Sequence, residues 1–83
     1  MIDDLFKDED LRMNVKNSAP SAYENAASEK LSEKINTHML DGLMTGNQEK
    51  VEYYNELSAD KNTQKQICIW IIRKIKDFLN LVR

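Results

Sequence analysis

The sequence predicts an all-α protein: a small three- or four-helix bundle, or a helical hairpin with a short N-terminal helix. Three observations lead to this prediction. The 83 residues include two glycines and one proline, too few for a turn-rich sandwich or barrel. Lys, Glu, Leu and Met, which favour helices, are frequent. Apolar residues recur at helical spacing along most of the chain.

The length allows one domain, residues 1–83. A chain this short buries only about 60–65% of the surface that its unfolded form exposes. Cys68 is the only cysteine and His38 the only histidine, which excludes an internal disulfide and the usual four-ligand zinc site. We therefore expect no metal and no cofactor. Small chains without such reinforcement depend on good helix packing or association. A homodimer, a higher homo-oligomer or another protein is the expected partner.

The N-terminal segment, residues 1–20, is predicted to contain one short helix. An acidic run at 8–10 precedes apolar residues at 11, 13 and 15. Acidic side chains stabilise the first turn of a helix. The helix should end before Pro20, because the residue before a proline avoids the α region.

A long amphipathic helix is predicted over residues 21–44. Ser21 and Glu24 form a capping-box pattern directly after Pro20. Five apolar residues then recur at intervals of four: Tyr23, Ala27, Leu31, Ile35 and Met39. Four more residues widen this face: Ala26, His38, Leu40 and Leu43. Residues 45–47 form the turn, with Gly46 as C-cap and Asn47 as the next N-cap.

A shorter helix is predicted over residues 48–58, where Val51, Tyr54 and Leu57 lie at helical spacing. The polar stretch 58–62 favours a break, and one continuous helix over 48–82 is the alternative. Thr63 and Gln66 form a second capping-box pattern directly before an apolar run.

The last helix, residues 63–82, has an apolar arc of roughly 200° at 100° per residue. A surface helix needs little more than 100°, so this helix should be covered on two sides. Six residues are predicted to form the core or a dimer contact: Ile67, Trp70, Ile71, Ile75, Phe78 and Leu79. A strand over 67–72 is the rival interpretation, because β-branched residues favour strands. The helical period continues through 73–76, and no second strand is evident.

The sequence indicates no catalytic site, and we expect a protein without enzymatic activity. Cys68 lies in an apolar run without a histidine nearby, which favours a buried core thiol over a nucleophile. His38 lies at the edge of the apolar face of its helix, which favours a packed or contact histidine over a base. The carboxylates lie at helical spacings on polar faces, and the chain has no glycine-rich phosphate loop.

Charge is distributed unevenly. Residues 1–60 carry 13 acidic and 6 basic side chains, whereas residues 61–83 carry 6 basic side chains and one acidic. The basic tail can pair with the acidic body, mediate head-to-tail association, or approach an anionic surface. The acidic body argues against a nucleic-acid partner. The acidic N-terminus does not resemble a secretory signal, and the longest apolar run, 67–72, is too short to span a membrane. We expect a cytoplasmic protein.

These features predict a small regulator, adaptor or inhibitor that acts by occupying another protein. The predicted partner surface combines an acidic segment with one edge of the long helix: Asp8, Glu9, Asp10, His38 and Asp41. By analogy, the composition suits a phage accessory protein, such as an inhibitor of host defence or a factor that times lysis. A membrane-surface protein is an alternative, because the last helix combines a wide apolar face, Trp70 and flanking bases.

Residues 23–77 also resemble the type III secretion needle subunits, short helical hairpins with a central Asn/Pro turn and a C-terminal Ile-Lys-Asp motif. Here Asn47 precedes residues 75–77, Ile-Lys-Asp, by a comparable interval. The resemblance implies a self-assembling structural subunit. The chain departs from that pattern because no proline follows Asn47, residues 61–66 are all polar, and residues 67–72 are more apolar.

Overall fold

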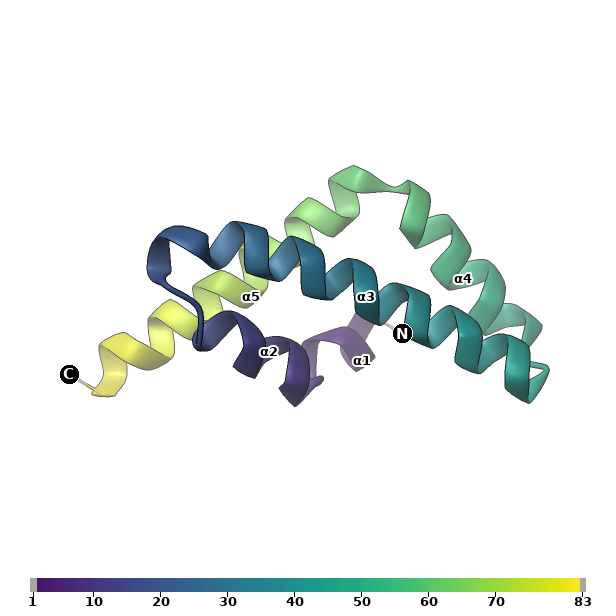
Figure 1. Cartoon of the computed structure of the whole chain (residues 1–83), viewed down its shortest axis with the longest axis horizontal. Coiled ribbons are helices and arrows are strands. Elements are labelled where there is room, and N and C mark those ends of the chain that lie inside the picture. Colours follow the sequence, from purple (N-terminus) through teal and green to yellow (C-terminus); the bar gives the residue numbers. More distant parts are fainter. Residues whose placement is uncertain (1, 83) are drawn as a thin grey trace.

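The computed structural model describes the backbone of residues 2–82 and the side chains of residues 2–78 (Figure 1). The elements in chain order are α1 (Ile2–Phe6), α2 (Glu9–Lys16), the 3₁₀ turn η1 (Pro20–Ala22), α3 (Tyr23–Thr45), α4 (Gln48–Ala59) and α5 (Lys61–Val82). These residues include no strand, and the predicted all-α fold class is confirmed. The strand considered for 67–72 is therefore wrong.

The molecule is elongated, with extents of 46 × 21 × 16 Å. The long helix α3 follows most of the long axis, and α4 folds back along it from one end (Figure 1). α5 then returns past α3 toward the other end, where its last turns extend beyond the neighbouring helices. α1 and α2 lie below α3 in the view of Figure 1, and α2 packs against both α3 and α5.

The entry into α2 matches the prediction, but the entry into α3 does not. The Leu11 amide donates to Asp8 Oδ1 at 3.0 Å, which caps α2. The capping box expected at Ser21 does not form, and no side chain caps α3. Its backbone starts a 3₁₀ turn at Pro20, in which the Ala22 amide donates to the Ala19 carbonyl at 2.8 Å. Ser21 therefore lies inside that turn and cannot take the extended conformation of an N-cap.

The turn between α3 and α4 follows the predicted local chemistry. Gly46 has a φ of 71°, which an L side chain rarely adopts, and Asn47 Oδ1 accepts from the Lys50 amide at 3.1 Å. Gly42 has a second role that the sequence did not indicate. A Cβ built on Gly42 would lie 3.0 Å from Val51 Cγ2, so the missing side chain lets α4 approach α3 closely.

α4 and α5 are two helices, separated at Asp60. The capping residue predicted at Thr63 is wrong, because Asp60 takes that role. Asp60 Oδ1 accepts from the Thr63 amide at 3.0 Å, and Asp60 Oδ2 accepts from the Thr63 hydroxyl at 2.6 Å. The buried Gln64 side chain strengthens the corner by donating to the carbonyls of Leu57 and Ser58. An aspartate one turn earlier therefore moves the start of α5 to Lys61.

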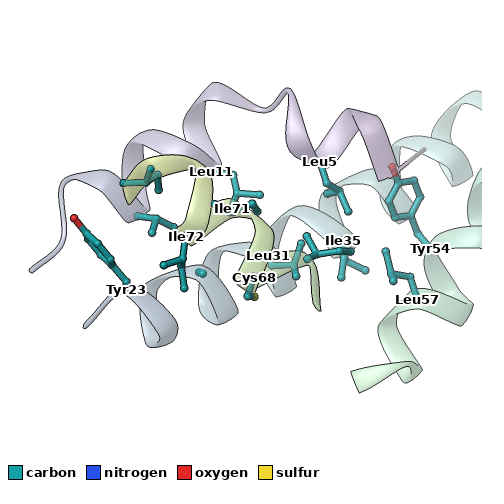
Figure 2. Close-up of a cluster of buried hydrophobic side chains, with 14 residues drawn as sticks. Leu5, Leu11, Tyr23, Leu31, Ile35, Tyr54, Leu57, Cys68, Ile71 and Ile72 are labelled. Atoms are coloured by element: carbon teal, nitrogen blue, oxygen red, sulfur yellow. The ribbon is translucent and has the colours of Figure 1, made fainter. Parts of the chain in front are cut away.

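A continuous core connects the helices (Figure 2). α5 contributes Ile67, Cys68, Ile71, Ile72 and Ile75. The other helices contribute Leu5, Leu11, Val15, Tyr23, Ala27, Leu31, Ile35, Tyr54 and Leu57. Burial of each large aliphatic side chain stabilises the fold by about 1.5–3 kcal/mol. Since α5 carries five of these residues, it packs against several neighbours at once, as its wide apolar arc predicts.

Candidate functional site

An open groove of about 650 Å³ lies between α2 and α5. We call it the α2–α5 groove, and eight residues line it: Glu9, Arg12, Met13, Lys16, Lys74, Ile75, Asp77 and Phe78. Its apolar surface comes from Met13 on one wall and from Ile75 and Phe78 on the other. Its charged groups are three cations and two carboxylates. The groove therefore combines an apolar floor with a mixed but predominantly basic rim.

The large apolar side chains of this groove are incompletely covered. Met13 is 49% exposed and Phe78 53% exposed, and both line the groove together with the core residue Ile75. Lys16 Nζ lies 4.9 Å from the centroid of the Phe78 ring, a cation–π distance. Trp70 lies on the same face of α5, two turns before Phe78, and its ring is 5.6 Å from that of Phe6. Large apolar surface at one location is typical of a binding site.

The six residues predicted as core or dimer contact therefore divide. Ile67, Ile71 and Ile75 are buried within the chain. The prediction that Trp70 and Phe78 are core residues is wrong. Both are exposed, because α1 and α2 are short and cover only part of this face of α5. Their role in a contact with another chain stays a prediction. The side chain of Leu79 lies outside the described residues.

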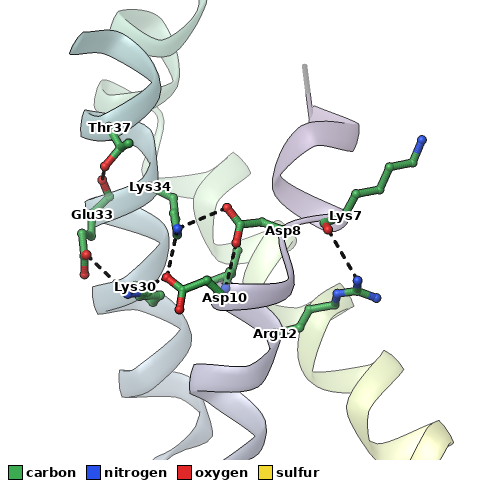
Figure 3. Close-up of polar contacts among 9 residues, drawn as sticks. Lys7, Asp8, Asp10, Arg12, Lys30, Glu33, Lys34 and Thr37 are labelled. Carbon is green, nitrogen blue, oxygen red and sulfur yellow. Dashed lines mark hydrogen bonds and ion pairs between the residues drawn. The ribbon is translucent and has the colours of Figure 1, made fainter. Parts of the chain in front are cut away.

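The acidic segment predicted as partner surface is engaged by α3 (Figure 3). Asp10 lies 3.0 Å from both Lys30 and Lys34, and Asp8 lies 3.4 Å from Lys34. The hydrogen bond from Lys34, supported by Lys30, lowers the pKa of Asp10. These carboxylates join α2 to α3, and Glu9, which is exposed, faces the α2–α5 groove.

The predicted edge at His38 and Asp41 is also engaged within the chain. The His38 ring stacks on Tyr54 with centroids 4.8 Å apart, and its buried Nε2 has no hydrogen-bond partner among the described residues. Burial lowers the pKa of His38, and the nearby Lys50 lowers it further. Lys50 also donates to Asp41 at 2.6 Å. The sequence grouped His38, Asp41 and the acidic run, but the structure assigns them to internal contacts.

The basic residues of α5 have no comparable partners. Within the described residues, no ion pair connects α5 with the acidic body, so the internal pairing considered from the sequence is not observed. Lys61, Lys65, Arg73, Lys74 and Lys76 are exposed. The body instead neutralises several of its carboxylates with its own lysines, Lys30, Lys34 and Lys50. The positive charge of α5 therefore remains available to another molecule.

A second apolar surface lies at the far end of α3. Leu40, Leu43 and Met44, which we call the α3 tip, are 59%, 59% and 87% exposed. Placing Leu40 and Leu43 on the core face was wrong. α4 packs against Gly42, which lies about 200° around the helix from Leu40 at 100° per residue. The tip consequently faces away from α4.

The remaining chemical candidates give no further site. Cys68 is buried, and burial raises the pKa of its thiol, so the reactive thiolate is disfavoured. In the described part of the chain, no three His, Cys, Asp or Glu side chains are grouped to hold a metal ion. No helix among the described residues has both the length and the hydropathy needed to cross a membrane.

No protein-family model, curated protein or solved structure matches this chain. The resemblance to needle subunits thus depends on the quoted residues alone. By fold, the molecule is a small all-α bundle, and its surface carries an apolar groove whose rim has three cations and two carboxylates.

Proposed function

We propose that this protein is a non-enzymatic binding module, a regulator, adaptor or inhibitor that acts by occupying another protein. Its α2–α5 groove receives an amphipathic helix of that protein. The observation that carries the proposal is the pair of half-exposed side chains, Met13 and Phe78, that face one groove from two helices.

Helix-in-groove recognition needs an apolar channel between two packed helices, with room for side chains spaced three or four residues apart. The groove provides this channel, with Ile75 at the edge of the core and Met13 and Phe78 as its walls. Methionine adapts to different side chains, and aromatic residues often dominate binding energy. The groove therefore suits a helical ligand better than a small polar substrate.

The rim indicates the charge of the ligand. Three cations, Arg12, Lys16 and Lys74, line the groove against two carboxylates, Glu9 and Asp77, so the groove carries a formal net charge of +1. Complementary charge directs association and excludes partners of the wrong sign. We therefore expect a helix whose apolar residues are flanked by Asp or Glu.

The packing gives less support to the membrane-surface alternative. A surface helix inserts its apolar face into lipid, but α5 buries Ile67, Ile71 and Ile75 in the core of its own chain. Among the described residues of α5, the large apolar side chains left exposed are Trp70 and Phe78. The needle-like alternative retains one supporting feature, the exposed apolar α3 tip.

A library of amphipathic helical peptides with acidic flanks tests the proposal. Peptides selected on the wild-type chain should bind Phe78→Asp at least about tenfold more weakly, because the new carboxylate repels their flanks and removes apolar contact. Leu40→Asp is the matched control, since it places the same charge on an equally exposed position outside the groove. Equal binding to all three proteins, or no selected peptide at all, would contradict the proposal.

A further inference from the structure

We infer that the α3 tip of a second copy of this chain occupies the α2–α5 groove. The inference rests on the proposed function, because it names the helix that the groove receives when no other protein is present. Its basis is the complementarity between two surfaces at different ends of the same molecule.

The α3 tip has the spacing that a helix-binding groove requires. Leu40, Leu43 and Met44 lie at positions i, i+3 and i+4, within an arc of about 100°. All three side chains are more than half exposed. The tip therefore forms an apolar ridge of the kind that fits between Met13 and Phe78.

The net charges around the two surfaces have opposite signs, because the groove has three cations against two carboxylates whereas carboxylates precede the tip on α3. Glu29 and Glu33 lie on the same arc of α3 as the tip, two to three turns before Leu40, and both are exposed, although Glu33 also pairs with Lys30 at 3.3 Å. Lys16 and Lys74 are cations of the groove, and no described carboxylate pairs with either. A docked tip thus places carboxylates beside cations that the chain itself leaves unpaired.

The fold prevents a molecule from filling its own groove. The tip lies at the end of α3 where α4 begins, whereas α2 and the second half of α5 lie in the other half of the long axis (Figure 1). Contact between the two surfaces therefore requires a second copy. Because two different surfaces meet, each copy offers both a tip and a groove.

The contact should be weak. A short groove against three apolar side chains buries an area at the low end of specific interfaces, below about 1,200 Å² in total. Association at such interfaces depends strongly on concentration. We expect mass to rise through the range from about 10 μM to 1 mM, which corresponds to weak binding.

Sedimentation velocity across that range tests the inference on the full chain. The wild type should gain mass with concentration, whereas Phe78→Asp and Leu40→Asp should each remain monomeric. Asn55→Asp is the matched control, because it adds the same charge to an exposed position of α4 outside both surfaces, and it should behave as wild type. Circular dichroism should show unchanged helix content in all four proteins.

Mixing the two disrupted variants gives the decisive result. Phe78→Asp retains an intact tip and Leu40→Asp retains an intact groove, so an equimolar mixture should form a 1:1 complex although neither variant associates alone. A mixture that stays monomeric would overturn the inference, as would self-association of either variant at wild-type strength. If the wild type stays monomeric while selected peptides still bind the groove, the inference fails and the proposed function stands. If neither occurs, both fail.

Discussion

The two halves of α5 share one apolar pattern but lie in different environments. In the first half, Ile67 and Ile71 are buried, with exposed fractions of 0% and 1%. In the second half, Ile75 is still covered, yet Phe78 is 53% exposed beside unpaired cations. α3 and α4 accompany the first half, whereas the short α2 reaches only part of the second. An apolar stripe thus becomes core where a neighbouring helix covers it and binding surface where that helix ends.

The largest expected effect comes from placing a charge in each half of α5. Ile71→Lys buries an unpaired ammonium group in the core and should lower the free energy of unfolding by about 3 kcal/mol or more. Phe78→Lys on the same helix should change it by no more than about 0.5 kcal/mol, as for other surface positions. Urea denaturation followed by circular dichroism measures both. Equal losses for the two variants would show that the second half of α5 is not an open surface.

The pH dependence of the free energy of unfolding tests the contact between His38 of α3 and Tyr54 of α4. His38 stacks on Tyr54 and faces Lys50, Asp4, Asp8 and Asp41. Burial lowers its pKa in the folded state, so the unfolded chain binds a proton first as the pH falls through about 6.5. The free energy of unfolding should therefore be lower at pH 5.5 than at pH 7.5.

His38→Phe is the control for this test, because it keeps a ring against Tyr54 and removes the titration. The loss of stability between pH 7.5 and 5.5 should shrink in this variant. Asp10 and Asp41 have lowered pKa values, so their contribution is lost only as the pH falls below about 4 and does not overlap this window. An identical pH dependence in both proteins would show that His38 is not the responsible group.

The smallest expected effect concerns the charges of the inferred contact. Lys74→Glu should weaken self-association by up to about fivefold, the range of one exposed ion pair. Glu33→Lys should weaken it similarly, and a mixture of the two variants should recover part of the loss through the reversed pair. Equilibrium sedimentation at low and high salt measures the change. If neither substitution changes the strength of self-association, the electrostatic part of the inference is wrong.

Local sequence chemistry predicted much of the fold. The left-handed Gly46, the Asn47 cap and the break before α5 depend on neighbouring residues, and the structure has all three. The capping boxes at Ser21 and Thr63 were wrong because Pro20, one residue before Ser21, starts a 3₁₀ turn and Asp60, three residues before Thr63, caps α5 instead. Such competition between adjacent signals is not apparent from a motif alone.

The site was less predictable because it depends on which helices meet. Leu40 and Leu43 belong to a continuous apolar pattern, but α4 packs on the Gly42 side and leaves them exposed. The sequence predicted Asp10 as part of an acidic partner surface, but α2 places its carboxylate between Lys30 and Lys34 of α3. Met13 and Phe78 are 65 residues apart, and no periodicity indicates that they share a groove.

We propose that this protein binds another protein through the exposed second half of α5. A dilution series of the ¹⁵N-labelled wild-type chain, followed by two-dimensional NMR, tests it residue by residue. We predict that concentration-dependent amide shifts fall in residues 9–16, 74–78 and 40–44, with residues 52–58 of α4 unchanged. Shifts concentrated in α4 would contradict this proposal. It would also be contradicted if the spectra do not change with concentration and added peptides do not shift the amides of α2 and α5.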